Sequence, residues 1–392
     1  MVGSTNLVKF VGLTSFMESF NRYLISQITP WLFKGKVIIV LGARQVGKTT
    51  VSKTLINSVE NGLYVNCERL VIQELLAGLN PEKIKSFVGN ALLVVFDEAQ
   101  KVQNIGALLK LLVDTYPEIQ WVATGSSSFD LANQVNEPLT GRNVKFLMFP
   151  LWIGELASLE NRLVSHEKLE SILRFGLYPD IYLRPETEKR ALLEELATDY
   201  LYRDVLELQS VKNPTVLMNL LKALALQLGN EVSLREMSGL LGVAIETIQR
   251  YLNLLEQSFV IFKLGPFSRN IRSELNKTQK YYFYDLGIRN SLINNFNPIA
   301  LRTDQGALWE NFCILERMKM HAAKGRKLSM YFWRTYEQNE IDLIEDYDGK
   351  LHAIEFKWNP KRKVKMPKVF AEAYPDSDFT VIHPGNYWEF LV

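Results

Sequence analysis

The stretch that decides the fold is KVIIVLGARQVGKTTVSKTLI, residues 36–56. It opens with a short apolar run rich in β-branched residues, which predicts a buried strand. A Gly-x-x-x-x-Gly-Lys-Thr loop follows at residues 42–49, and helical periodicity follows the loop. Strand, glycine loop and helix in this order predict a phosphate-binding loop, because backbone N–H groups and a helix N-terminus both attract anions. The alternative is a glycine-rich turn that binds no ligand.

This loop predicts a site for ATP and Mg²⁺ in the first half of the chain. Lys48 would reach the β and γ phosphates, and Thr49 would ligate the Mg²⁺. The other residues expected to line the nucleotide belong to the same loop and the first turn of its helix: Gly42, Ala43, Arg44, Gln45, Val46, Gly47 and Thr50.

A partner for the loop follows in ALLVVFDEAQ, residues 91–100, where an apolar strand ends in two acids. Asp97 would hold the Mg²⁺ through water, and Glu98 would orient and deprotonate the attacking water. The alternative for such a pair is a helix N-cap on the next segment. Given the phosphate loop, we expect the catalytic roles.

Two further segments carry candidates for the γ phosphate. The strand in IQWVATGSSS, residues 119–128, ends in hydroxyls, and Thr124 or Ser126 would sense the phosphate; simple turn chemistry is the alternative. Arg142 follows a glycine and precedes an apolar strand. It would act as an arginine finger in a neighbouring subunit, which predicts a homo-oligomer. The alternative is a surface or ion-paired arginine.

Bulk composition excludes several classes of protein. The 392 residues are enough for two or three domains, and the net charge of +2 creates no global field toward nucleic acid or membrane. The two cysteines lie far apart in the sequence, which fits a reducing cytoplasm. The longest apolar runs fall far short of the roughly 20 residues of a membrane span. We see no signal-peptide pattern, and expect a cytoplasmic protein with no membrane partner.

The sequence predicts helices in the middle of the chain. Residues 213–267 contain a proline-initiated helix, a capping box at Ser233, a glycine stop at Gly242, a second helix and a strand, which together predict a winged helix-turn-helix. The apolar stripe of its second helix would be Ile245, Ile248, Leu252 and Leu255. Its solvent face would carry Glu246, Gln249, Arg250, Asn253 and Glu256. The two acids favour a structural brace over a DNA-reading helix, although both remain open.

The C-terminal part contains LHAIEFKW, residues 351–358, in which strand alternation places Glu355 and Lys357 on one face and the core residues on the other. Asp348-Gly349 predicts a hairpin that brings Asp342 beside them. Asp342 and Glu355 would bind a divalent cation, Lys357 would orient water, and Glu310 would support the site from a helix. The alternative is a surface ion pair.

A local basic run lies just beyond this strand. Its members are Lys361, Arg362, Lys363, Lys365 and Lys368. Phosphate contacts to such a run would be sensitive to salt, which predicts binding of nucleic acid. The alternative is a solvated loop.

From about residue 18 to its end, the chain resembles a known family. The segments that carry the resemblance are GARQVGKTT, VVFDEAQ, ATGSSS, LTGR, FPLWIGEL, FGLYPDIY, YLYRDV, KYYFYDLGIRN and NEIDLI with AIEFKW. It is similar to the prokaryotic AAA+-related ATP-binding proteins that have a C-terminal domain of unknown function. One departure is FGLYPD, where two adjacent glycines are expected before the tyrosine.

The resemblance implies an α/β protein with a P-loop ATPase core, a winged helix and a C-terminal domain like the PD-(D/E)xK nucleases. The expected domains are a helical lead-in (1–34), the ATPase core (35–150), a helical lid (151–212), the winged helix (213–267) and the nuclease-like domain (268–392).

Two functions from different classes remain. The first is an ATPase that couples hydrolysis to binding or cleavage of nucleic acid, DNA rather than RNA. The second is a STAND-like signalling switch whose nuclease-like domain binds without cutting.

Overall fold

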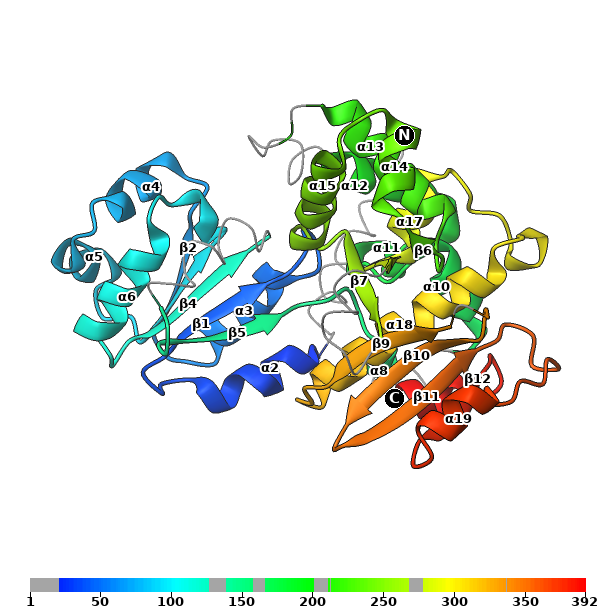
Figure 1. Cartoon of the computed structure of the whole chain (residues 1–392). Coiled ribbons are helices and arrows are strands. Elements are labelled where there is room, and N and C mark those ends of the chain that lie inside the picture. Colours follow the sequence, from blue (N-terminus) through cyan, green and yellow to red (C-terminus); the bar gives the residue numbers. More distant parts are fainter. Residues whose placement is uncertain are drawn as a thin grey trace, which may run out of the picture. The chain divides into compact units, whose positions relative to one another are not determined.

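The computed structural model describes residues 21–126, 139–157, 166–200, 211, 213–267, 278–335 and 337–392 (Figure 1). They form two compact units. The first consists chiefly of the described residues up to Leu151, and the second chiefly of Trp152–Leu177, Pro185–Glu256 and Val260–Val392. Most of the motif YLYRDV, with Arg203 and Asp204, lies outside the described residues.

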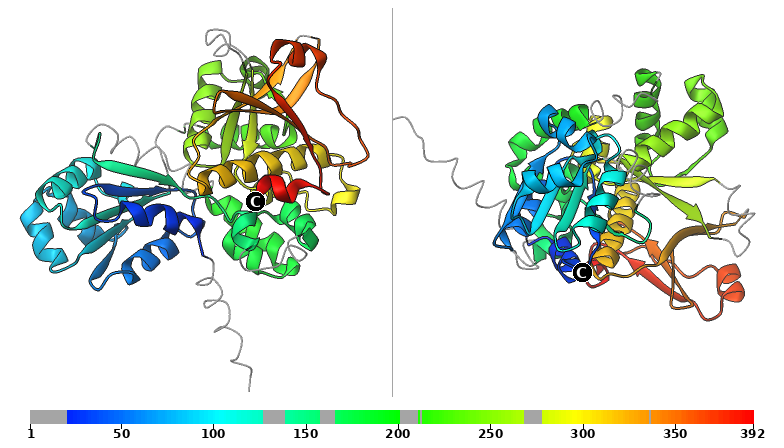
Figure 2. Two further views of the ribbon diagram at one scale, coloured as in Figure 1. Left: turned by 90° about the horizontal axis from the view of Figure 1, so that it is seen from below. Right: turned by 90° about the vertical axis from the view of Figure 1, so that its left-hand side faces the viewer.

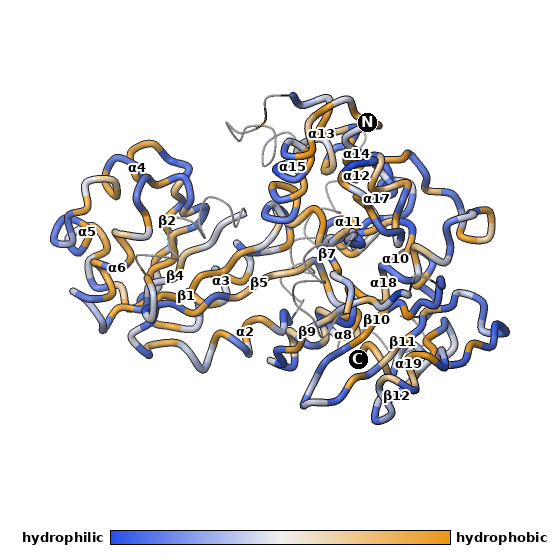
Figure 3. Tube along the Cα trace, viewed as in Figure 1, coloured by the Kyte–Doolittle hydropathy of each residue, from blue (hydrophilic) through white to orange (hydrophobic). Residues whose placement is uncertain are grey.

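The first unit is built on a five-stranded sheet in the order β2-β3-β4-β1-β5, and every strand pair in it is parallel. Its strands are β1 (Val37–Leu41), β2 (Gly62–Asn66), β3 (Leu93–Asp97), β4 (Gln120–Gly125) and β5 (Asn143–Leu147). β1, β3 and β4 are buried along their whole length, as expected of central strands covered on both faces. Figure 3 shows β1 as an apolar stretch. The predicted α/β P-loop core is confirmed at this level.

Because all five strands run parallel, their carboxyl ends meet at one edge of the sheet. The helices of this unit are α2 (Tyr23–Ile28), α3 (Lys48–Asn57), α4 (Leu70–Ala77), α5 (Pro81–Val88), α6 (Ile105–Thr115) and α11 (Pro179–Leu183), with short 3₁₀ turns η1 (Thr29–Trp31) and η2 (Ala99–Lys101). Polar residues that follow β1, β3 and β4 are thereby brought together.

The second unit is built on a seven-stranded mixed sheet in the order β12-β11-β10-β9-β7-β8-β6. Its strands are β6 (Glu231–Val232), β7 (Ile261–Pro266), β8 (Gln279–Phe283), β9 (Ser329–Arg334), β10 (Glu340–Tyr347), β11 (Lys350–Phe356) and β12 (Asp378–Ile382). β10 and β11 form the predicted hairpin, with Asp348 and Gly349 both at positive φ. These are the backbone angles that a two-residue Asp-Gly turn requires.

Helices cover both faces of this sheet. α18 (Gln305–Ala323) crosses one face, where Trp309 Nε1 donates to the Ile382 carbonyl over 3.2 Å, and α20 (Tyr387–Leu391) packs beside it (Figure 2). On the other face, Phe370 of α19 (Lys368–Ala373) packs with Ile344 and Ala353. We expected a core on one face of β11 only. Both faces are packed, because α19 follows the basic run back over the sheet.

The remaining helices of the second unit surround the sheet. They are α8 (Ile153–Ala157), α10 (Leu169–Phe175), α12 (Glu186–Tyr200), α13 (Pro214–Leu226), α14 (Leu234–Leu241), α15 (Ile245–Gln257) and α17 (Leu286–Leu292), with the short turn η4 (Ile299–Leu301). No helix in the described parts of the chain combines the length and the apolar character needed to cross a membrane.

The segment expected to form a winged helix contributes strands to the same sheet as the C-terminal hairpin. Ser233 caps α14 by accepting from the Glu236 amide, and Gly242 ends that helix at φ +66. α15 is followed within four residues by β7, which pairs with both β8 and β9. The expected segments 213–267 and 268–392 therefore share one sheet, because β7 lies between strands of the second segment.

The faces of α15 differ from the expectation at both ends. Ile245 is 41% exposed, so the apolar stripe starts one turn later, at Ile248. Glu256 is half-buried and ion-paired with Lys263, and burial raises the pKa of its carboxyl. The solvent face therefore carries one acid fewer than expected.

The turn at FGLYPD needs only one glycine. Gly176 adopts φ +75, and a Cβ there would lie 2.1 Å from Asp285 Oδ1. The next residue, Leu177, donates its amide to Asp285 Oδ2 over 2.7 Å. Leu177 stands where the second glycine is expected. It contacts Asp285 through its backbone amide, so this position does not require a glycine.

Candidate functional site

The loop between β1 and α3 is shaped by two glycines. A Cβ on Gly42 would lie 2.3 Å from the Met148 carbonyl oxygen, which leaves no room for any other residue. Gly47 adopts φ +102, where L residues are strained, and α3 begins at the next residue. The loop thus wraps tightly onto the end of the sheet and leads directly into a helix N-terminus.

Lys48 lies at the start of α3 and is buried. Its Nζ donates to the carbonyl oxygens of Gly42 and Ala43, both over 2.9 Å, so the ammonium is held inside the loop. Arg22 adds a brace that the sequence motif did not indicate. Its guanidinium donates to the carbonyls of Val46 (2.6 Å) and Phe149 (2.7 Å).

Asp97, at the end of β3, lies beside this loop. Thr49 Oγ1 donates to Asp97 Oδ2 over 3.0 Å, which places the two expected Mg²⁺ ligands together. Tyr64 of β2 donates its hydroxyl to the same Oδ2, and Thr124 donates to Oδ1. Burial and the Asp97 carboxylate raise the pKa of Tyr64, which keeps it a donor. This donor set fits a hydrated Mg²⁺, which takes one or two protein oxygens and keeps several waters.

Glu98 is held in an unusual conformation next to Asp97. Its backbone has φ +52, in the left-handed region that non-glycine residues occupy rarely and mostly where the surroundings enforce it. Its Oε2 accepts from Ser126 Oγ (3.1 Å) and from Gln100 Nε2 (2.5 Å). Of the two hydroxyls expected to sense phosphate, Ser126 therefore lies against Glu98, whereas Thr124 is turned to Asp97.

Arg142 lies directly before β5, at the opposite end of that strand from Leu147. Its Nε donates to Asp114 over 2.6 Å, and both side chains are more than 40% exposed. The arginine is therefore ion-paired within its own chain and still accessible. Exposed pairs of this kind contribute little stability, so the contact does not prevent Arg142 from serving another subunit.

In the second unit, Asp342 of β10 and Glu355 of β11 lie side by side. The Asp342 amide donates to Glu355 Oε2 over 3.4 Å, and the Phe356 amide donates to Asp342 Oδ2 over 2.8 Å. Lys357 Nζ is 2.6 Å from Glu355 Oε1 and 3.6 Å from Asp342 Oδ2. The hairpin register thus brings the three predicted residues together, and the ammonium contacts both carboxylates.

Glu310 of α18 extends the same cluster. It accepts from Tyr282 Oη over 2.5 Å, and its Oε1 is 3.3 Å from Lys280 Nζ. Lys280 also pairs with Glu340 at 2.6 Å and is almost fully buried. Lys280 and Tyr282 were missed from the sequence, although their spacing on β8 places both on one face of a strand. We refer to Lys280, Glu310, Asp342, Glu355 and Lys357 as the acid cluster.

Burial and charge shift the pKa values of this cluster. Burial raises the pKa of Glu310 to about 7, partly opposed by Lys280. Burial raises the pKa of Asp342 against the opposing charge of Lys357, and burial together with Asp342 raises that of Glu355. Burial lowers the pKa of Lys357, but its carboxylate partners outweigh this and raise it. The acids therefore hold protons more tightly than usual, as expected where carboxylates share a buried site.

The acid cluster fits a cation only in part. Within the described parts of the chain, no three His, Cys, Asp or Glu side chains are arranged to hold a metal ion. Asp342 and Glu355 supply two adjacent carboxylates, which is as many as Mg²⁺ commonly takes from a protein that also binds substrate phosphate. Two adjacent carboxylates with no cation between them would repel each other. Lys357 prevents this by lying against both.

The predicted basic run is exposed. All five of its cations are exposed: four lie between β11 and α19, and Lys368 is the first residue of α19. The run supplies a local positive surface on the same unit as the acid cluster.

Three family models match successive parts of the chain. Residues 34–157 match the model of an AAA domain, residues 166–298 match a domain of unknown function (DUF8612), and residues 305–388 match a second domain of unknown function (DUF4143). The phosphate loop, Asp97, Glu98 and Arg142 all fall in the first match. Glu310, Asp342, Glu355 and Lys357 all fall in the third.

Relatives align along most of the chain. An uncharacterized protein of Mycobacterium tuberculosis is 29% identical over 331 residues, which cover 83% of this chain and 71% of the relative. An uncharacterized protein of Methanocaldococcus jannaschii is 28% identical over 367 residues, which cover 88% and 80%. The solved structure of the Walker-type ATPase PABY2304 of Pyrococcus abyssi has a TM-score of 0.51 at 18% identity, covering 70% of this chain and 96% of that one, which shows a shared fold. These similarities and the phosphate loop support a P-loop protein related to the AAA ATPases, with a C-terminal domain from a family of unknown function.

Proposed function

We propose that this protein binds and hydrolyses ATP with Mg²⁺ in its first unit and couples this to nucleic-acid binding or cleavage in its second. The observation that carries the proposal is the pairing of two acid sites in one chain. One surrounds Asp97 beside a phosphate loop, and the other is the acid cluster beside an exposed basic run.

In the ATP site, the residues of the loop would hold the phosphates and Lys48 would contact the β and γ groups. Thr49 and Asp97 would hold the Mg²⁺, which supplies charge neutralisation on the phosphates. Glu98 would accept the proton of the attacking water, and Ser126 holds the carboxylate in place for that role. Arg142 would reach the γ phosphate bound by a second copy of the chain.

In the acid cluster, Asp342 and Glu355 would hold a divalent cation, which supplies an activated water and neutralises a scissile phosphate. Lys357 would orient the water, and Glu310 would support the cluster from α18. The basic run would hold the flanking phosphates of the strand. The ammonium groups of Lys280 and Lys357 lie against the carboxylates of the cluster. They would reduce the repulsion between these acids and a polyanionic substrate.

The alternative is a STAND-like ATP-dependent switch in which the second unit binds without cutting. One specific observation favours it. Lys357 already contacts both carboxylates, as in a structural ion pair, and no third acid in the described residues completes a metal site.

Lys48→Ala tests the ATP half of the proposal. Removing the ammonium should weaken ATP binding by roughly 100-fold, because truncating a buried charge that pairs with a ligand costs about 2–5 kcal/mol. Titration calorimetry with ATP and Mg²⁺ measures the change. Lys53→Ala, on the same helix but outside the loop, is the matched control and should bind as wild type does. Equal affinity in Lys48→Ala and wild type would rule out this site.

Replacing Lys361, Arg362 and Lys363 together with alanine tests the nucleic-acid half. If about four phosphates are contacted, the log–log dependence of duplex DNA affinity on salt should have a slope of about −3.6 in wild type. The triple variant should flatten that slope by nearly three units, as measured by fluorescence anisotropy across a salt series. An unchanged slope would move the binding surface away from the basic run, with α15 next to be tested.

A further inference from the structure

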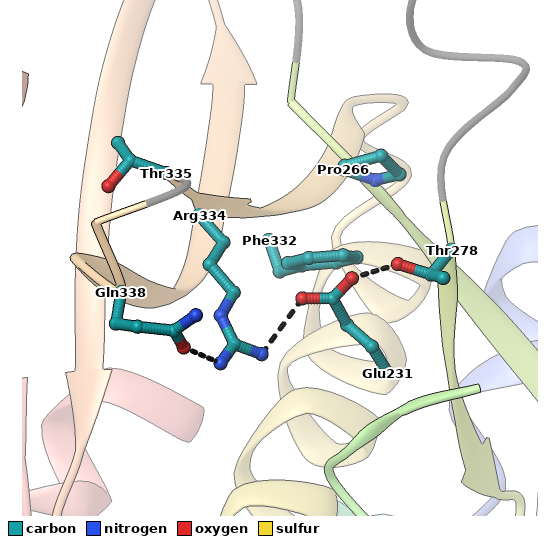
Figure 4. Close-up of a pocket in the computed structure, with 7 residues that line it drawn as sticks. All are labelled: Glu231, Pro266, Thr278, Phe332, Arg334, Thr335 and Gln338. Carbon is teal, nitrogen blue, oxygen red and sulfur yellow. Dashed lines mark hydrogen bonds and ion pairs between the residues drawn. The ribbon is translucent and has the colours of Figure 1, made fainter. Parts of the chain in front are cut away.

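A pocket of about 400 Å³ opens on the second unit (Figure 4). Phe332 and Pro266 supply its apolar walls, and its polar walls come from Glu231, Thr278, Arg334 and Gln338. This volume lies in the range of small-molecule sites, roughly 300–1,000 Å³. Nothing in the proposed ATPase or cleavage chemistry uses these residues.

The polar wall presents a donor directly beside an acceptor. Arg334 Nη1 donates to Glu231 Oε1 over 2.9 Å, and Thr278 donates its hydroxyl to Glu231 Oε2. Gln338 accepts from the other terminal nitrogen of Arg334, which fixes the plane of the guanidinium (Figure 4). Both members of the ion pair remain accessible, with Arg334 34% and Glu231 24% exposed. A guanidinium has five N–H donors and a carboxylate about four acceptor positions, so each keeps capacity for a ligand.

This donor–acceptor row matches the hydrogen-bonding edge of an unpaired nucleobase. Guanine fits it most fully, because its O6 accepts from an arginine while the adjacent N1–H and N2–H both donate to a carboxylate. The other bases can make only two of these three bonds. Phe332 and Pro266, which are largely buried, add apolar contact in the pocket wall, so recognition rests on the polar edge.

The pocket is connected to the acid cluster through neighbouring residues on paired strands. Glu231 is the strand partner of Lys280, and Lys280 Nζ lies 5.4 Å from the centre of the Phe332 ring. Arg334 is the strand partner of Glu340, which is ion-paired with Lys280. Three residues of the pocket wall, Glu231, Phe332 and Arg334, therefore neighbour Lys280 or its partner Glu340, and Lys280 in turn contacts Glu310.

We propose that this pocket binds one unpaired guanine base of a nucleic-acid strand and so positions the strand at the acid cluster. This deepens the proposed function and rests on it, because it assumes that the second unit holds nucleic acid. Recognition depends on Glu231 for the base N–H groups and on Arg334 for O6. Gln338 acts as a positioning residue for Arg334.

The test uses the full chain carrying Lys48→Ala, so that free nucleotides do not occupy the ATP site. Binding of GMP, AMP, CMP and UMP is measured by calorimetry. Binding of labelled oligo-dT with one central dG, dA or dC is measured by anisotropy. GMP and the dG strand should each bind roughly tenfold tighter than their competitors, since one added bond to a charged group separates them. Glu231→Gln should bring the four bases to about equal affinity.

Gln338→Ala is the second variant, because this side chain is exposed and its loss leaves the strands intact. It should weaken dG and dC binding by a similar factor of several-fold, because both bases accept from Arg334. Arg190→Ala, which removes an exposed arginine paired with Glu194 in the same unit, is the matched control and should change nothing. Thermal melting checks that each variant is folded.

The outcomes separate this inference from the proposed function. If oligonucleotides bind without base preference and Glu231→Gln has no effect, the pocket proposal is overturned while nucleic-acid binding stands. If GMP binds selectively but no oligonucleotide binds, the guanine chemistry of the pocket is supported, and both its role on a strand and the nucleic-acid function are overturned.

Discussion

Replacing Glu98 with glutamine is expected to lower ATP turnover by roughly 10²–10⁴-fold while leaving ATP binding nearly unchanged. An amide cannot accept the proton of the attacking water, and loss of a general base costs about this factor. The amide oxygen can still accept from Ser126, so the geometry of the site should persist. Steady-state phosphate release and calorimetry on the same sample measure the two quantities.

Glu74→Gln provides the matched control for this experiment. Glu74 is an exposed residue of α4 in the same unit, and its replacement should leave turnover at the wild-type rate. The assignment of Glu98 as the base would be wrong if Glu98→Gln turned over ATP as fast as this control. Loss of binding and turnover together would instead indicate a role for Glu98 in holding the loop.

The second large effect is expected at the acid cluster. Glu355→Gln and Asp342→Asn should each reduce metal-dependent cleavage of nucleic acid at least about 100-fold, because the cation supplies several kcal/mol of transition-state stabilisation. Each should also weaken Mn²⁺ binding, which calorimetry detects without substrate. Lys357→Ala should keep Mn²⁺ binding and lose the rate, since lysine ligates no cation. Duplex, single-stranded and branched substrates are assayed with Mg²⁺ and Mn²⁺.

Asp346→Asn is the control for this second set, because Asp346 is exposed on the same strand as Asp342. It should alter neither metal binding nor cleavage. If the wild-type protein cuts none of the substrates with either metal, the cleavage proposal fails. The ion pairs of Lys357 would then serve a binding unit, as the STAND-like alternative requires.

Local motifs predicted the parts of both sites that depend on short stretches of chain. Gly42 and Gly47 are needed for the backbone geometry of the phosphate loop, and the Asp348-Gly349 turn sets the hairpin. The loop and the hairpin could therefore each be predicted from adjacent residues. Asp342 and Glu355 were expected to meet because a hairpin register is fixed by its turn. The structure brings them into contact.

Residues that reach a site from distant segments could not be predicted in this way. Arg22 and Tyr64 contact the loop and Asp97 from other elements, and neither belongs to a motif. Lys280 comes from β8, whose place in the sheet depends on pairings with β6 and β7. The pairing of strands far apart in sequence is set by tertiary packing, which local propensity does not contain.

The strand alternation used to place Asp342 also has a local exception. The register of β10 against β9 shifts between Ile341 and Ile344, so these two residues pack in one cluster although they are three apart. A simple period of two would place them on opposite faces. Such a bulge re-aims side chains near the end of a strand, and here it lies beside Asp342.

The shared seven-stranded sheet has a consequence for any duplex that the second unit holds. α15 leads directly into β7, and β7 is joined through β9 to β10, which carries Asp342. Hydrogen-bonded strands of a packed sheet do not slide past one another, so the helix and the acids keep a constant separation. Contact at α15 and scission at Asp342 would be offset by a fixed number of nucleotides. The sheet would then fix the distance along the duplex between the contact made by α15 and the cut, whatever sequence the protein binds.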